Sequence, residues 1–139
     1  MACELCTEDH PQMIWGNENF YLIDASNEDF PCYLRLVSRR HVPDVTDLPE
    51  LERVEMWLLL MRIENMIKNV MQPDKVNLAQ FGNMVPHLHW HIIARWQDDT
   101  YFPECPWGKK LRDTLPALTE DRQQRFAHLK ATLAAMPSN

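Results

Sequence analysis

The stretch Val85-Pro86-His87-Leu88-His89-Trp90-His91-Ile92-Ile93-Ala94-Arg95-Trp96 alternates histidine with apolar residues. Alternate side chains of a β-strand share a face, so the three histidines are expected on one face of a strand, about 6–7 Å apart in succession. The histidines are His87, His89 and His91. The opposite face is apolar and is expected to anchor the strand in the core, through Leu88, Trp90 and Ile92.

Three histidines in register on an apolar strand indicate chemistry rather than packing, because each buried imidazole needs a polar partner. Two interpretations fit this pattern. The histidines belong to a metal site, since imidazoles at i and i+2 are a common pair of ligands. Alternatively, one histidine is a nucleophile, and its neighbours position the electrophile and hold the tautomer.

Further strands are expected before the histidine strand. Residues 20–24 and 33–37 are largely apolar, and the turn-forming residues between them predict a hairpin with a long loop. Residues 75–81 predict another strand, which is followed by Gly82-Asn83 and then by the histidine strand over 87–96.

Two helices are expected. The first covers residues 46–71, with Thr46 or Asp47 as its cap, and the second covers 119–136, with Thr119 as its cap. The order of strand, strand, helix, strand, strand, helix predicts an α+β fold with a mainly antiparallel sheet.

The first helix carries two apolar stripes. One has the spacing of a single buried face, and its members are Met56, Leu59, Leu60, Ile63, Met66, Ile67 and Val70. The other lies on roughly the opposite side, and its members are Val54, Trp57, Leu58 and Met61. A surface helix needs only one stripe, so the second is expected to meet another part of the chain or a partner subunit.

Composition restricts the class of protein. The chain has 139 residues, 45% of them hydrophobic, which predicts a single domain over residues 1–139. Its 20 acidic residues outnumber the 14 basic ones, which disfavours a nucleic acid polymer as a partner but permits a small phosphorylated ligand. The longest apolar run, 56–61, is too short to span a membrane. The first residues lack the pattern of a signal peptide, so a cytoplasmic location is expected.

The pattern His87-Leu88-His89-Trp90-His91-Ile92-Ile93 resembles the signature of the histidine triad (HIT) superfamily of nucleotide hydrolases and transferases. Val76-Asn77 and Gly82-Asn83-Met84-Val85 are similar to the family's sequence before the triad, and the resemblance covers roughly residues 1–96. The tail over 98–108 resembles a bacterial branch described as diadenosine tetraphosphate hydrolase-like. The resemblance implies a HIT-like fold, with an antiparallel sheet of about five strands, one long helix and a C-terminal helix. The core would cover about 1–96, and the tail and last helix about 97–139.

The resemblance also implies a mechanism. His89 would attack the α-phosphorus of a dinucleoside polyphosphate or nucleoside phosphoramidate, and water would hydrolyse the covalent nucleotidyl-histidine. The other ring nitrogen of His89 is expected to donate to a backbone carbonyl, which fixes the tautomer. His91 would stabilise charge on phosphate oxygens, and His87 completes the catalytic set. The positions implied to bind the nucleotide are Asn77 and Asn83 at phosphate and Asp24 at the ribose.

Two residues depart from the family's pattern. Met84 stands where the family has Ser or Thr, and Asn83 stands where it has Gln, which bears on phosphate placement and on the choice of leaving group. In the proline-rich tail, Trp107 is expected to anchor packing and to cover the nucleotide site.

The segment Cys3-Glu4-Leu5-Cys6 has the spacing of zinc ligands, but a single Cys-x-x-Cys needs two more. In zinc-bearing relatives these are two histidines, at positions that here read His41 and His87. The resemblance thus implies a closed, structural zinc site of Cys3, Cys6, His41 and His87. It implies no catalytic cofactor, allows a nucleotide substrate that arrives with Mg²⁺, and implies a homodimer.

Two alternatives stay open. The first is a metal-dependent hydrolase or oxygenase with the three strand histidines as ligands. The long helix and the 3 glycines disfavour it, because small jelly-roll metal proteins are all-β and rich in glycine turns. The second is a non-catalytic nucleotide-binding or scaffold protein, which would bind nucleotides without turning them over.

Overall fold

The computed structural model describes residues 3–138 and contains one antiparallel five-stranded sheet, in the order β1-β2-β3-β5-β4. The strands are β1 (Met13–Gly16), β2 (Phe20–Asp24), β3 (Tyr33–Ser38), β4 (Lys75–Ala79) and β5 (His89–Arg95). The helices are α1 (Glu50–Met71) and α2 (Pro116–Ala134), and a short 3₁₀ helix covers Val45–Asp47. These elements confirm the α+β class and the antiparallel sheet.

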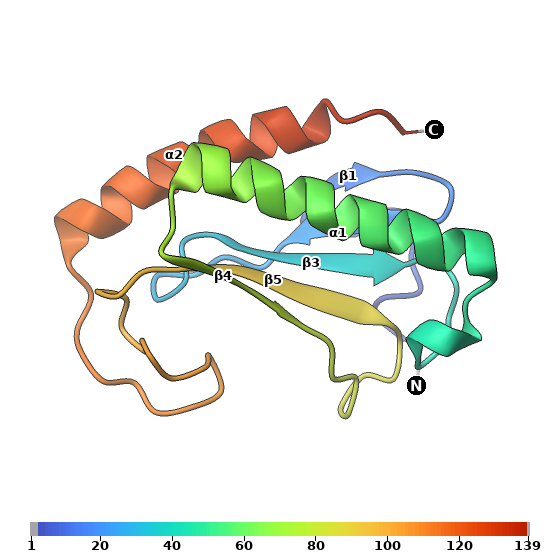
Figure 1. Cartoon of the computed structure of the whole chain (residues 1–139), viewed down its shortest axis with the longest axis horizontal. Coiled ribbons are helices and arrows are strands. Elements are labelled where there is room, and N and C mark those ends of the chain that lie inside the picture. The colour runs from blue at the N-terminus through green and yellow to red at the C-terminus, as the bar shows by residue number, and fades with distance from the viewer. Residues whose placement is uncertain (1–2, 139) are drawn as a thin grey trace.

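Both helices lie on one side of the sheet (Figure 1). α1 packs on β4 and β5, and α2 packs on α1 and β1. Every second strand residue points into the layer between helices and sheet, including Leu22, Leu34, Leu36 and Ile92. The main core therefore occupies one face of the sheet, and the other face is left for the site.

The two apolar stripes of α1 have different surroundings. Residues of the first stripe are buried in the core, namely Met56, Leu59, Leu60, Ile63 and Ile67. Residues of the second stripe are between 46% and 64% exposed, namely Val54, Trp57, Leu58 and Met61. Within residues 3–138 the chain does not cover the second stripe.

The helix starts differ from those expected. α1 begins at Glu50 after Pro49, and Thr46 lies with Asp47 in the preceding 3₁₀ helix, so neither residue caps α1. The prediction of Thr119 as the cap of the last helix is also wrong. α2 begins at Pro116, and the hydroxyl of Thr119 donates to the carbonyl of Leu115, one turn earlier. Proline at the first position is favourable because its missing N–H has no helical acceptor there.

Strand boundaries also differ. The edge strand β1 was not expected from the sequence, and it pairs with β2 through a register shift between Met13 and Trp15. β4 ends at Ala79 rather than at 81. β5 begins at His89, because the backbone N–H of His87 donates to Val85 in a turn instead of joining the sheet.

The face of the sheet opposite the helices is partly covered by two irregular segments. The N-terminal segment lies against β2, where the hydroxyl of Tyr21 donates to the carbonyl of Leu5 at 2.6 Å. Residues 97–115 form a long loop after β5, in orange in Figure 1. Among the described residues, no helix is long and apolar enough to cross a membrane.

Candidate active site

His89 and His91 point to the open face of β5, between β3 and β4. Their register partners on β3 are Val37 and Arg35, and their ring centroids lie 5.0 Å apart. Both side chains are more than nine-tenths buried. The alternation of the strand therefore brings two of the three histidines to one face, with Leu88 and Ile92 in the core beneath them.

The tautomer of His89 follows from its one hydrogen bond. Nδ1 lies 2.6 Å from the carbonyl oxygen of His87, and a carbonyl only accepts. Nδ1 therefore carries the hydrogen, and Nε2 keeps its lone pair. The expected bond from His89 to a backbone carbonyl is confirmed, and it makes Nε2 a potential nucleophile.

His91 is held by Tyr33, whose hydroxyl lies 2.6 Å from Nδ1 of the imidazole. Burial lowers the pKa of His91 to about 4, and electrostatic interactions with His89 and Arg35 add to the shift. Burial also raises the pKa of Tyr33, although Arg35 opposes the shift. Both groups are thus neutral near pH 7, so this is a bond between a neutral phenol and a neutral imidazole.

Arg35 brings a positive charge to the same face. Its guanidinium carbon lies 5.6 Å from the centre of the Tyr33 ring, and its buried Nε has no hydrogen-bond partner among the described residues. Neither Tyr33 nor Arg35 was identified as a site residue from the sequence. The available signal was a single charged residue in the apolar strand Tyr33–Ser38.

Two aromatic side chains border the site on the other side of His91. The ring of Trp107 lies 4.9 Å from that of His91, edge to face, and Phe81 lies 6.3 Å from it. Phe81 and Trp107 also contact each other, with centroids 5.0 Å apart. Trp107 contacts His91, but its side chain is 53% exposed, so it is not the buried packing anchor expected from the sequence. Phe81 was not singled out from the sequence.

The residues predicted to bind the nucleotide lie in three different settings. Asn77 is on β4, and its Oδ1 accepts a 2.9 Å hydrogen bond from Arg95. Asn83 is exposed in the loop after β4. Asp24 is not brought together with the triad, because its carboxylate accepts hydrogen bonds from Ser26 and from Lys130 of α2. Burial would raise the pKa of Asp24, but these bonds outweigh it and lower the pKa.

A second cluster brings together Cys3, Cys6, His41 and His87. One ligand atom from each lies within 4.8 Å of all the others. Nδ1 of His87 is 3.4 Å from each sulfur and 3.0 Å from Nδ1 of His41. Zinc bonds of about 2.0–2.3 Å in a tetrahedron place ligand atoms roughly 3.3–3.8 Å apart, so the spacing is close to that of a four-ligand site.

The donor chemistry of this cluster also fits a metal. Nε2 of His87 lies 2.6 Å from the carbonyl of Ser38, so Nε2 carries the hydrogen and Nδ1 presents a lone pair to the cluster. A backbone acceptor behind a histidine ligand is the usual way to orient it. This is the one group of possible metal ligands among the described residues, and it includes neither His89 nor His91. That arrangement disfavours the three strand histidines as a joint metal site.

The comparisons with known proteins agree with this geometry. The model of the HIT domain family matches residues 7–98, which is more than half of the chain. The chain therefore belongs to the HIT family, and the predicted HIT-like fold is confirmed.

Several named proteins are similar to this chain in sequence or in structure. The AP-4-A phosphorylase of Mycobacterium tuberculosis (strain ATCC 25618 / H37Rv) is 30% identical over 103 residues, which cover 70% of this chain and 51% of that protein. The chain thus spans about half the length of this curated relative. A histidine triad protein from Bradyrhizobium japonicum shares the fold with a TM-score of 0.68 at 24% identity, over 87% of this chain and 96% of the other. A zinc-bound histidine triad family protein from Mycobacterium smegmatis has a TM-score of 0.58 at 20% identity, over 94% of each chain.

Proposed function

We propose that the protein is a nucleotide hydrolase that cleaves dinucleoside polyphosphates or nucleoside phosphoramidates at the α-phosphorus, through a covalent nucleotidyl-His89 intermediate. The observation that carries the proposal is the 2.6 Å hydrogen bond between Nδ1 of His89 and the carbonyl of His87. It leaves Nε2 free to attack, beside a neutral His91. The similarity to a relative named AP-4-A phosphorylase supports dinucleoside polyphosphates as the substrate class.

In the first step, Nε2 of His89 forms a bond to the α-phosphorus. The bond from phosphorus to the leaving group breaks, and its electron pair stays on the leaving group. The leaving group departs as a phosphate anion from a dinucleoside polyphosphate or, with a proton taken from solvent, as ammonia from a phosphoramidate. Nδ1 keeps its hydrogen and donates to the carbonyl of His87 throughout, which stabilises the positive charge that develops on the ring. In this proposal the Tyr33 hydroxyl donates to Nδ1 of His91, which lies 2.6 Å away. The ring hydrogen of His91 is then on Nε2, where it can bind a phosphate oxygen.

In the second step, water attacks the phosphorus and releases a proton. The phosphorus–nitrogen bond breaks, its electron pair returns to Nε2 of His89, and a nucleoside monophosphate leaves. Asn77 and Asn83 contribute side-chain amides to the phosphate in this proposal. A ribose contact by Asp24 would first have to break its bond to Lys130, at 3.0 Å.

The test is hydrolysis of diadenosine tetraphosphate and of adenosine phosphoramidate, with and without Mg²⁺, by wild type and by His89→Ala. Loss of a covalent nucleophile is expected to lower kcat by a factor on the order of 10³ or more. The matched control is His128→Ala, which changes an exposed histidine of α2 and should retain wild-type rates. Turnover that survives in His89→Ala would overturn the mechanism. Nucleotide binding without any turnover would favour a binding protein instead.

We also propose that zinc occupies the cluster of Cys3, Cys6, His41 and His87 in reduced protein, as in a cytoplasm. The ligand geometry supports this, as does the zinc-bound relative from Mycobacterium smegmatis. A closed four-ligand site adds folding energy and would hold the N-terminal segment against the sheet. Metal analysis should find about one zinc per chain in wild type and in the control Cys105→Ser, and much less in Cys6→Ser. Wild type without zinc, purified reduced and free of chelator, would contradict it.

A homodimer completes the proposal. Its support is the exposed apolar stripe of α1, which the chain does not cover within residues 3–138. An apolar helix face of this kind is typical of a subunit interface.

A further inference from the structure

The exposed aromatic pair Phe81 and Trp107 is the feature that the proposed reaction leaves unused. These side chains are 55% and 53% exposed, although both contact the buried ring of His91. Exposed tryptophan and phenylalanine side chains that cluster beside a reactive group commonly serve binding, because the same rings gain free energy when a ligand covers them. Here the pair forms the solvent-facing border of the site.

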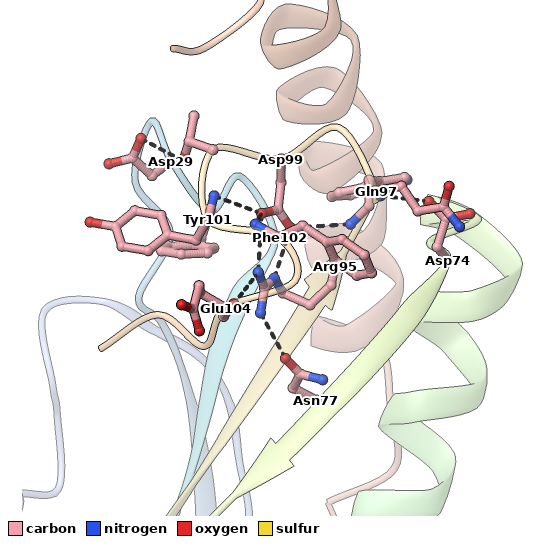
Figure 2. A network of polar contacts seen from close by, with 12 residues as sticks. Asp29, Asp74, Asn77, Arg95, Gln97, Asp99, Tyr101, Phe102 and Glu104 are labelled. Atoms are coloured by element: carbon pink, nitrogen blue, oxygen red, sulfur yellow. Dashed lines mark hydrogen bonds and ion pairs between the residues drawn. The ribbon is translucent and has the colours of Figure 1, made fainter. Parts of the chain in front are cut away.

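Arg95, at the end of β5, forms a network of hydrogen bonds with residues of the loop over 97–115, which carries Trp107 (Figure 2). The guanidinium donates to both carboxylate oxygens of Asp99, at 2.7 and 3.1 Å, and to the carbonyl of Glu104 at 2.7 Å. Its remaining nitrogen donates to Asn77 of β4. One buried side chain therefore ties the loop to two strands of the site.

Local backbone contacts then fix the turn at Trp107 itself. The N–H of Gly108 donates to the carbonyl of Cys105 at 2.9 Å, and a Cβ at Gly108 would lie 3.2 Å from that oxygen. The Trp107 ring itself packs against Phe81 and His91, at 5.0 and 4.9 Å between centroids. A side chain placed by such contacts before a ligand arrives loses less freedom on binding, which favours a flat partner.

Trp107 also lies beyond the residues that the HIT family model matches. The HIT domain match ends at residue 98, and Trp107 follows it in the loop over 97–115. Its contacts with His91 and Phe81, at the border of the site, suit substrate selection rather than bond formation at His89.

We propose that Trp107, supported by Phe81, is the platform on which the nucleobase of the leaving nucleotide stacks. The inference rests on the proposed function. Among the described residues, Trp107 pairs with His91 and Phe81 and not with His89. In an in-line displacement the leaving group points away from the attacking nitrogen, so it extends past His91 toward this border. Trp107 is exposed to solvent, which suits contact with the leaving group, because the leaving group must depart before water attacks.

Stacking makes a prediction about substrate class. Every nucleobase has a flat face, so a tryptophan platform would accept any base on the leaving side. A leaving group without a base, such as the ammonia of a phosphoramidate, would gain nothing from it. The inferred preference is therefore for dinucleoside polyphosphates over nucleoside phosphoramidates.

The test compares kcat/KM for diadenosine tetraphosphate with kcat/KM for adenosine phosphoramidate, since both transfer the same nucleotide. Trp107→Ala should lower the ratio of the two values by about 5- to 100-fold, as expected for one lost base–aromatic stack. Trp107→Phe keeps a flat ring and should retain most of the ratio. The control Leu111→Ala, at an exposed apolar residue of the same loop, should leave the ratio unchanged.

Other outcomes overturn the inference. If Trp107→Ala lowers kcat/KM equally for both substrates, the ring contacts the transferred nucleotide or only packs. If the ratio in Trp107→Phe is as low as in Trp107→Ala, stacking is excluded. If wild type turns over neither substrate, the proposed function fails. Calorimetric titration then tests the inference separately. Trp107→Ala should weaken the binding of diadenosine tetraphosphate more than the binding of AMP. An unchanged ratio of the two Kd values would refute it.

Discussion

At the scale of single residues, two neighbouring histidines are fixed by different kinds of partner. His89 depends on a backbone carbonyl, which no side-chain substitution removes. His91 depends on the hydroxyl of Tyr33, which one substitution deletes. The tautomer of His89 is therefore fixed by the backbone, whereas a substitution of Tyr33 can change the tautomer of His91.

Tyr33→Phe tests the contribution of this hydroxyl. The change removes the hydrogen bond to Nδ1 of His91 and keeps the aromatic ring in place. A neutral hydrogen bond of this kind contributes about 0.5–1.5 kcal/mol, so kcat should fall by about 3- to 10-fold while KM changes little. Steady-state kinetics on diadenosine tetraphosphate measures the effect. A wild-type kcat in Tyr33→Phe would show that the bond does not matter for the reaction.

The low pKa of His91 predicts how stability depends on pH. The folded protein resists protonation of His91 until about pH 4, whereas the unfolded chain takes up this proton near its ordinary pKa of 6.5. The unfolded state therefore binds more protons between these values, and the free energy of unfolding should fall as the pH is lowered from 6.5 to 4.

The measurement is urea unfolding at a series of pH values for wild type and His91→Gln. The variant lacks this titration, so its free energy of unfolding should decline less steeply across the same window. Parallel curves for the two proteins would mean that the pKa of His91 is not lowered by folding.

At the scale of elements, the strongly patterned segments were predictable and the weakly patterned ones were not. The apolar stripe of α1 and the alternation of β5 both follow from a repeating pattern that burial requires. β1 was missed because it has four residues, ends in Gly16 and pairs along one edge only, so it carries no alternation long enough to detect. The start of α2 was misplaced because Pro116, not Thr119, sets it.

The loop over 97–115 contains Asp99 and Glu104, which Arg95 binds through a buried network, so one substitution can test how far this network holds the loop. Arg95→Leu would leave Asp99 buried without its cation, and breaking a buried ion pair in this way costs about 3–5 kcal/mol. We expect a lower Tm and faster amide hydrogen exchange in this loop. The control Arg125→Ala removes an exposed pair with Asp121 and should change the free energy of unfolding by less than about 1 kcal/mol. Slow exchange in the loop of Arg95→Leu would show that other contacts suffice.

At the scale of the whole molecule, the site joins parts of the chain that the sequence cannot place together. The triad pattern predicted His89 and His91 as site residues, and the resemblance to zinc-bearing relatives predicted Cys3, Cys6 and His41 as metal ligands. Arg35 and Phe81 reach the site through strand register and loop packing. The sequence marks Arg35 only as the one charged residue of an apolar strand, and it gives no signal for Phe81. Asp24 shows the reverse case, since its position at a strand end fitted a ribose ligand while its side chain faces α2.

The uncovered stripe of α1 makes a prediction about assembly. Wild type should sediment as a dimer at micromolar concentration, at twice the 16.5 kDa of one chain. Leu58→Glu places a charge on a residue that is 64% exposed in the single chain, so it should yield a folded monomer. Leu111→Glu, outside the helix, should remain dimeric. A monomeric wild type would remove the dimer from the proposal.

His87 takes part in both clusters, with its ring in one and its carbonyl in the other. A metal bound at the ring and a nucleotidyl group bonded to His89 would therefore act on the same residue. Thermodynamic linkage makes such an influence reciprocal: the factor by which metal changes the equilibrium for nucleotidylation is the factor by which nucleotidylation changes metal affinity. Zinc binding and nucleotidylation of His89 would then each depend on the other through the single residue His87.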